Sequence, residues 1–244
     1  MKPYSLHFKA EKMELDASTA RARVDRAKHE IQGGWFDNKA IRRNYFSIDK
    51  IHFGYQPPHR SRVIRKPAEK DAWWNVNPQK RSKKQRQQEA KNRKARGEQP
   101  SVHAIGIVGY NYKSPFLFYK IPGNVTGKMT SQIYIQLLKP LLKHLEDHYS
   151  HRDFILWEDG DSSHRFTKNN VAYKWKKRNS YKFVRNVHNS PKTNWIESSV
   201  KRLKSYIRKY FFDGEAQLKE LVQESWNGLN QEKINNDLDS MPQR

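Results

Sequence analysis

The order of strand-like and helix-like segments is the feature that most restricts how this 244-residue chain can fold. Residues 45–53 have the composition and alternation of a strand, and 102–108 and 116–121 predict two more strands around a turn at 111–115. Adjacent strands joined by a short turn pair in an antiparallel manner. The first part of the chain therefore predicts an antiparallel region of a sheet.

Helical patterns dominate the rest of the chain. An apolar stripe follows the capping pair Thr130–Ser131 and predicts a helix, and 154–157 then predicts a short buried strand. The stripe consists of Ile133, Leu137, Leu138, Leu141, Leu142 and Leu145. Further helices are predicted at 18–32, 163–178, 195–212 and 215–227, the first with Ala20, Val24, Ala27 and Ile31 on one face. This order predicts an α/β fold with a mixed sheet flanked by helices.

The charge of the chain restricts its partners. Lys and Arg number 48 against 25 Asp and Glu, which gives a formal net charge of +23 and a pI of about 10.1. Such a charge draws a protein to nucleic acid through counterion release. The chain has no cysteine, which excludes disulfides and thiolate zinc fingers. Neither a membrane-spanning run nor a secretory leader is visible, so we expect no membrane partner.

One segment interrupts the pattern. Between Pro78 and Pro100 there are nine Lys or Arg, two Glu and no aliphatic residue larger than Ala, so the segment cannot contribute to a core. We interpret 78–100 as a basic disordered insertion in a single domain at 18–244, after a tail at 1–17. Its cations suit either a phosphate-contacting arm or a nuclear address, and a solvated loop is the plain alternative. The candidate phosphate contacts are Lys83, Lys84, Arg93 and Lys94.

Two carboxylates have positions suited to chemistry. Asp159 follows the strand at 154–157, and Glu197 lies at the start of a predicted helix. In so basic a chain, this pattern indicates a metal site that faces a polyanion. Structural alternatives remain open, because Asn194 and Glu197 have capping-box spacing, and Asp159 and Asp161 around a glycine suit a turn or a helix cap. His164, at the end of the same segment, can likewise be either part of such a site or a satisfied structural residue.

Several motifs, in this order and spacing, resemble the catalytic domain of mariner-superfamily DDE transposases. They are Phe46–Ser47 with 52–54, the hairpin 62–67, the strand end 158–164 (Glu-Asp-Gly-Asp-Ser-Ser-His), 189–197 (Asn-Ser-Pro-x-x-Asn-x-Ile-Glu) with Leu203–Lys204, and the closing 239–244. The resemblance covers roughly residues 18–244. It implies a ribonuclease-H-like fold in which three carboxylates hold two Mg²⁺ or Mn²⁺ ions for DNA strand cleavage and transfer. A homodimer on transposon ends and a nuclear location are further implications. By this resemblance we expect the family's DNA-recognition region, which precedes the catalytic domain, to have no counterpart here.

The first motif departs from the family pattern, which runs Phe-Ser-Asp-Glu. This chain has Phe46-Ser47-Ile48-Asp49, so isoleucine stands where the first metal ligand is expected. Strand neighbours point to opposite faces, which turns Asp49 away from the ions unless a bulge or a slip of one residue turns it inward. If Asp49 points away, Ile48→Asp should raise cleavage activity. The candidate catalytic and metal-binding residues are thus Asp49, Asp159 and Glu197, and the alternative is a catalytically inactive, transposon-derived DNA-binding protein.

The predicted helix after Glu197 carries two different faces. Ile196, Val200, Leu203 and Ile207 form an apolar stripe that should pack on the sheet. Lys201, Lys204 and Arg208 follow Glu197 at helical spacing. We predict that these three cations contact a DNA backbone, whereas the structural alternative is a helix-stabilising Glu197–Lys201 pair.

Overall fold

The computed structural model describes residues 17–34, 38–54, 88, 92, 95, 101–120, 129–149, 153–186, 194–210, 212 and 214–241. Six strands form one sheet in the order β3-β2-β1-β5-β6, with β4 paired to β2 beyond this path. The strands are β1 (Tyr45–Gly54), β2 (Ser101–Gly109), β3 (Tyr112–Lys113), β4 (Leu117–Tyr119), β5 (Ile155–Glu158) and β6 (Lys182–Arg185). The sheet is mixed, because β1 pairs antiparallel with β2 but parallel with β5. The predicted fold class is confirmed.

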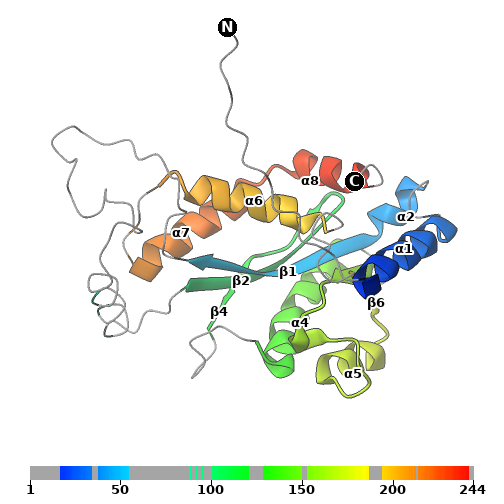
Figure 1. Cartoon of the computed structure of the whole chain (residues 1–244). Coiled ribbons are helices and arrows are strands. Elements are labelled where there is room, and N and C mark those ends of the chain that lie inside the picture. Colours follow the sequence, from blue (N-terminus) through cyan, green and yellow to red (C-terminus); the bar gives the residue numbers. More distant parts are fainter. Residues whose placement is uncertain are drawn as a thin grey trace, which may run out of the picture.

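Helices cover both faces of this sheet. Those on one side are α6 (Ile196–Ile207), α7 (Gly214–Asn227) and α8 (Gln231–Asp239); those on the other are α4 (Ser131–His148) and α5 (Val171–Arg178), as Figure 1 shows. We call these the α6 face and the α4 face. The short helix α2 (Lys39–Arg43) precedes β1, and α1 (Ala17–Gln32) reaches the edge strand β6, where the Arg26 guanidinium donates to the Arg185 carbonyl.

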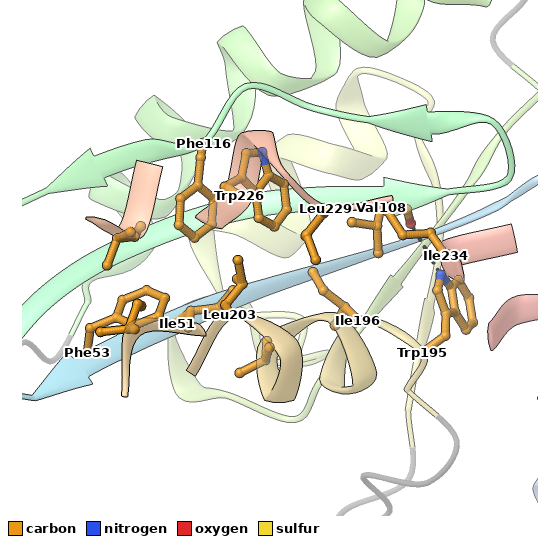
Figure 2. Packing of buried hydrophobic residues seen from close by; sticks show 14 of the residues in the cluster. Ile51, Phe53, Val108, Phe116, Trp195, Ile196, Leu203, Trp226, Leu229 and Ile234 are labelled. Atoms are coloured by element: carbon orange, nitrogen blue, oxygen red, sulfur yellow. Dashed lines mark hydrogen bonds between the residues drawn. The ribbon is translucent and has the colours of Figure 1, made fainter. Parts of the chain in front are cut away.

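Strand alternation divides the core into two clusters. Ile51 and Phe53 of β1 pack on the α6 face, whereas Phe46 and Ile48 pack on the α4 face. On the α6 face, the Trp226 ring stacks on Phe116 with centroids 4.2 Å apart (Figure 2). A Cβ on Gly106 would come within 2.8 Å of the Trp226 ring and 2.9 Å of the Phe116 ring. The glycine therefore leaves the room that the two rings need.

Most predicted elements are confirmed, and the differences have local causes. The predicted helix at 163–178 is a 3₁₀ turn, η4 (Ser162–His164), followed by α5, because the Asn170 side chain caps a new start by accepting from the Tyr173 N–H. The helix at 195–212 ends at Ile207. The segments α2, β3, β6 and α8 were not predicted; β3 lies in the predicted turn.

The helix predicted at 18–32 is confirmed as α1; of its apolar residues, Ala20 is exposed, Val24 is 53% exposed and Ala27 is partly buried. Residues 1–16, 62–67 and Trp73–Trp74 lie outside the described residues, as does 78–100 apart from Gln88, Asn92 and Ala95, which are helical. Within the part of the chain that the structure describes, no helix is long and apolar enough to cross a membrane.

Candidate functional site

Two of the candidate carboxylates follow neighbouring parallel strands. The pairing of β1 with β5 joins Tyr45 to Ile155 and ends where Ser47 meets Trp157. Asp49 and Asp159 each come two residues after that last pair, Asp49 within β1 and Asp159 just past the end of β5, so both lie beyond the same end of the β1–β5 pairing. Alternation also gives them the face of Ser47 and Trp157. That face is the α6 face, since the Trp157 ring lies 5.6 Å from Trp195, the residue just before α6.

The third carboxylate enters from α6. The start of α6 is fixed to β1 by a hydrogen bond in which the Ser47 hydroxyl donates to the Asn194 Oδ1. Both side chains are buried. Trp195 is the N-cap residue without a side-chain cap, and its indole N–H donates to the Val108 carbonyl at 3.2 Å (Figure 2). Glu197 therefore stands in the first turn of a helix anchored over β1. The capping-box interpretation of Asn194 is wrong, because its side-chain oxygen is bonded to Ser47.

The electrostatics of Asp49 reflect the proximity of the other two carboxylates. Burial of this carboxyl and the negative charges of Asp159 and Glu197 raise its pKa from 3.8 to about 8. Lys50 opposes the shift through its charge and its backbone N–H, which donates to the Asp49 Oδ1 at 2.7 Å. The lowering effect of Lys50 on the pKa of Asp49 is thus smaller than the combined raising effect of burial and the two carboxylates. This excess of negative charge favours the binding of a further cation.

Ile48 does not belong to this site. Its side chain is 2% exposed and packs in the cluster of the α4 face with Phe46, Ile105 and Ile107. The pairing of β1 with β2 runs without interruption from Ser47–Val108 to Gly54–Ser101, so no bulge is involved. The two neighbours do point to opposite faces, as alternation requires, but Asp49 is the one directed to the other carboxylates. The expectation that Ile48 fills the ligand position is wrong. Motif alignment placed Ile48 on the side of the metal ligands, whereas in the structure Asp49 is on that side and Ile48 is on the α4 face.

Asp159 is held by the polypeptide that follows it. Its Oδ1 lies 3.0 Å from the Nε2 of His164 and accepts the backbone N–H of Asp161 at 3.2 Å. Burial alone would raise the pKa of Asp159, but the His164 hydrogen bond and the charges of His164 and Lys50 bring it below its ordinary value. The turn interpretation of Asp159 is therefore correct as well.

Asp161 has a structural role, which confirms its prediction as a cap. Its Oδ1 accepts the Ser163 N–H at 2.7 Å at the start of η4 and also lies 2.5 Å from the Lys50 ammonium. Burial would raise the pKa of Asp161, but Lys50 and Ser163 lower it below its ordinary value. Sequence reasoning missed Lys50 at this place. Lys50 directly follows Asp49 in β1, and this adjacency was the sequence feature from which a cation near the carboxylates could have been predicted.

The donor set suits a hard divalent cation. The three side chains offer carboxylate oxygens, which Mg²⁺ and Mn²⁺ prefer, and they bring a negative charge that Lys50 only partly offsets. Among the described residues, no three acidic or histidine side chains converge closely enough to enclose one ion by themselves.

The basic residues of α6 are only partly placed at the site. The apolar stripe Ile196, Val200, Leu203 and Ile207 is buried, as predicted. Lys201 and Arg208 are exposed, and Lys204 is half-buried. Lys204 lies near the end of β1, because its charge contributes to lowering the pKa of His52 to about 4, after the larger effects of burial, His103 and Lys50. Lys83, Lys84, Arg93 and Lys94 lie outside the described residues.

Comparisons with known proteins agree with this geometry. No protein-family model and no curated protein matches the chain. The isolated catalytic domain of Mos1 mariner transposase is similar to it, with a TM-score of 0.63 and 12% identity over 94% of this chain and 91% of that domain. A pre-cleavage Mos1 transpososome has a TM-score of 0.70 and 13% identity over 100% of this chain and 65% of the Mos1 chain. The chain thus spans about two-thirds of that protein's length. It has the ribonuclease-H-like fold of the mariner transposase catalytic domain.

Proposed function

We propose that this chain is a mariner-type DDE transposase catalytic domain that cleaves and transfers DNA strands with divalent metal ions. The observation that carries the proposal is the meeting of Asp49, Asp159 and Glu197 on the α6 face, from β1, β5 and α6. Structural scaffolding does not require carboxylates from three separate elements to lie near one another. A site for two ions between a protein and a phosphate backbone does.

Each residue has a distinct role in this proposal. Asp49, Asp159 and Glu197 would hold the ions, with Asp159 as the central ligand. When bound, the ions supply activation of an attacking water or 3′-hydroxyl and stabilisation of the leaving oxygen. The chain itself fixes the ligands: His164 holds one oxygen of Asp159, the Lys50 N–H holds one oxygen of Asp49, and the Ser47–Asn194 bond sets the start of α6.

DNA is the proposed substrate. The net charge of +23 supplies general attraction to a phosphate backbone. Lys201, Lys204 and Arg208 run along the helix that begins at the candidate metal site, so they are suited to follow a strand away from it. Mos1 has been solved as a paired-end complex with Mn, with Mg and with its left transposon end. By analogy we propose Mg²⁺ or Mn²⁺ as cofactor, a homodimer on transposon ends, and work in the nucleus.

The direct test is metal-dependent nicking of supercoiled DNA. We expect activity with Mg²⁺ or Mn²⁺ and none with EDTA. Asp49→Asn, Asp159→Asn and Glu197→Gln should each reduce the rate by roughly a thousandfold or more, because each removes a ligand charge where the transition state needs it. Asp147→Asn is the matched control, since Asp147 is an exposed carboxylate on α4 that pairs with Lys143 on its own helix.

Two outcomes would contradict the proposal. Asp49→Asn with wild-type activity would remove Asp49 from the site. DNA binding without any metal-dependent nicking by the unmodified chain would favour the alternative, an inactive transposon-derived DNA-binding protein.

A further inference from the structure

A buried polar cluster lies directly behind Asp159, on the α4 face. Its centre is Glu158, the last residue of β5, whose side chain is 0% exposed. The Tyr134 hydroxyl donates to the Glu158 Oε1 at 2.6 Å, and the Lys176 ammonium donates to the Oε2. Together with His164 these residues form what we call the Glu158 cluster. It connects α4, α5, β5 and η4 immediately next to the candidate metal site.

Lys176 is enclosed as completely as the carboxylate that it pairs with. Its side chain is 0% exposed, and its Nζ lies 4.2 Å from the Phe183 ring centroid and 5.3 Å from that of Phe166. Burial lowers the pKa of Lys176, and Glu158 opposes this effect. The ammonium group therefore has one carboxylate and two aromatic faces in place of water.

His164 connects this cluster to Asp159. Its Nε2 lies 3.0 Å from the Asp159 Oδ1, while its Nδ1 lies 3.9 Å from the Glu158 Oε2. The ring is 3% exposed, and its centroid is 4.6 Å from that of Tyr134. The imidazole thus stands between two carboxylates, and the Tyr134 ring limits its rotation. The His164 Nδ1 has no hydrogen-bond partner among the described residues, so the Glu158 charge and the Tyr134 ring act on the imidazole through proximity and packing.

Stability alone does not account for a buried ion pair of this kind. Removing two charges from water costs several kcal/mol per ion, and well-packed apolar replacements are often neutral or stabilising. The rest of the α4 face shows that apolar residues suffice there, since Leu138, Leu141, Leu142 and Leu145 are all 0% exposed. The Glu158–Lys176 pair is better explained by the adjacent site, because hydrogen-bonded neighbours of metal ligands fix the orientation of those ligands.

We propose that Glu158, Lys176 and Tyr134 are positioning residues that act through His164 to hold the Asp159 carboxylate toward the metal site. This inference rests on the proposed function. None of the three touches substrate or metal. Their role is to keep the end of β5 and the His164 ring in one arrangement, so that Asp159 has one orientation before the ions arrive.

The test removes the buried charges while keeping the packing. In the double variant Lys176→Met with Glu158→Gln, we expect a melting temperature close to that of the wild type. Mn²⁺ affinity, measured by calorimetry, should fall roughly 10- to 100-fold. In DNA nicking kcat should fall with little change in KM. In nitrogen-15 NMR spectra recorded without metal, the His164 ring signals should broaden or multiply, because the ring has lost its fixed neighbour.

Arg43→Met is the matched control. It breaks a partly buried ion pair with Asp239, 3.0 Å long, between α2 and α8. We expect this change to lower the melting temperature while leaving Mn²⁺ affinity and the His164 signals as in the wild type. It thereby separates a general loss of stability from a loss of positioning.

A double variant with wild-type Mn²⁺ affinity and wild-type His164 signals would overturn the inference. If the double variant does not fold, Tyr134→Phe replaces it, since that change removes only the hydroxyl that donates to Glu158. Unchanged Mn²⁺ affinity and unchanged His164 signals in Tyr134→Phe would then overturn the inference. If the wild type itself binds no Mn²⁺, the proposed function fails, and the His164 signals still show whether the cluster fixes the ring.

Discussion

The two faces of the sheet hold carboxylates in opposite ways. On the α4 face, Glu158 is buried with a full set of partners, an ammonium group and a phenol, from two helices. On the α6 face, Asp49 has one backbone N–H and two neighbouring carboxylates that repel it, and its pKa is raised to about 8. Glu158 is therefore balanced by a cation, whereas burial and the two neighbouring carboxylates leave the charge of Asp49 incompletely compensated.

The difference distinguishes a scaffold from a site. A carboxylate with all its charge compensated connects elements of the fold and needs nothing further. A group of carboxylates with insufficient compensation costs stability in the free protein, and that cost is recovered when a cation binds. The four predictions below compare changes on the two faces, from the largest expected effect to the smallest.

The largest effect on stability should come from Ile48→Asp. This change places a carboxylate in the apolar cluster of the α4 face, where the Ile48 side chain is 2% exposed and has Phe46, Ile105 and Ile107 as neighbours. We expect the free energy of unfolding to fall by about 4 kcal/mol or more, and nicking activity to fall with it. Urea denaturation measures the first effect. Ile48→Val, the control, should cost only about 1 kcal/mol. A stable, more active Ile48→Asp protein would show that Ile48 occupies the ligand position after all.

The next largest effect should come from Gly106→Ala on the α6 face. The added methyl group would lie within 2.9 Å of both the Trp226 and Phe116 rings, which stack on each other. We expect a loss of about 1–3 kcal/mol in the free energy of unfolding, because the rings must separate. Gly228→Ala, where the nearest atom is 3.4 Å away, serves as the control. Equal stability of the two variants would mean that the α6 face is packed less tightly than described.

The pH dependence of stability should report Asp49 itself. Its pKa is raised above that of the unfolded chain, so the folded protein keeps this proton while the unfolded chain releases it. In EDTA, stability should therefore fall as pH rises from about 4 to about 8. Asp49→Asn removes this contribution, so the variant should be more stable than the wild type at pH 8 by about 1–3 kcal/mol, allowing for partial exposure. Parallel pH profiles of the two proteins would contradict the crowding of the three carboxylates.

The smallest effect on stability is expected for Lys201→Ala with Lys204→Ala. These side chains lie on the exposed and half-exposed positions of α6, so the melting temperature should stay nearly unchanged. DNA affinity should fall, and the slope of log affinity against log salt should decrease by roughly 0.9 for each lost phosphate contact. Fluorescence anisotropy at several salt concentrations measures both. An unchanged slope would leave these lysines as solvated surface residues.

Much of the fold could be predicted because its elements are amphipathic and carry their own caps. The helix α4 begins where Thr130 predicted, and the buried stripe of α6 is the predicted one. By contrast, β6 has a half-exposed and exposed pattern at the sheet edge, so it lacks the apolar run that identifies a strand. The helix α1 was predicted from its apolar spacing, but Ala20 and Val24 of that stripe are exposed, while Ala27 is partly buried together with Arg23 and Arg26.

The candidate site was predictable in its residues but not in its geometry. Asp159 and Glu197 stand out because a strand end and a helix start are recognisable in sequence. The orientation of Asp49 depends on which alternate residues of β1 face α6. Contacts between residues distant in the chain, such as Ser47 with Asn194, determine this. Glu158 and Lys176 were missed for the same reason, since charged residues 18 positions apart give no local signal of being paired.

The most direct test of the central claim is a crystal structure of the protein with Mn²⁺ and DNA, in which anomalous scattering locates the ions. We predict two ions, one between Asp49 and Asp159 and one between Asp159 and Glu197. Ions absent from Asp49, or a density confined to Glu197 or to surface carboxylates such as Asp147, would contradict the claim that these three residues form one metal site.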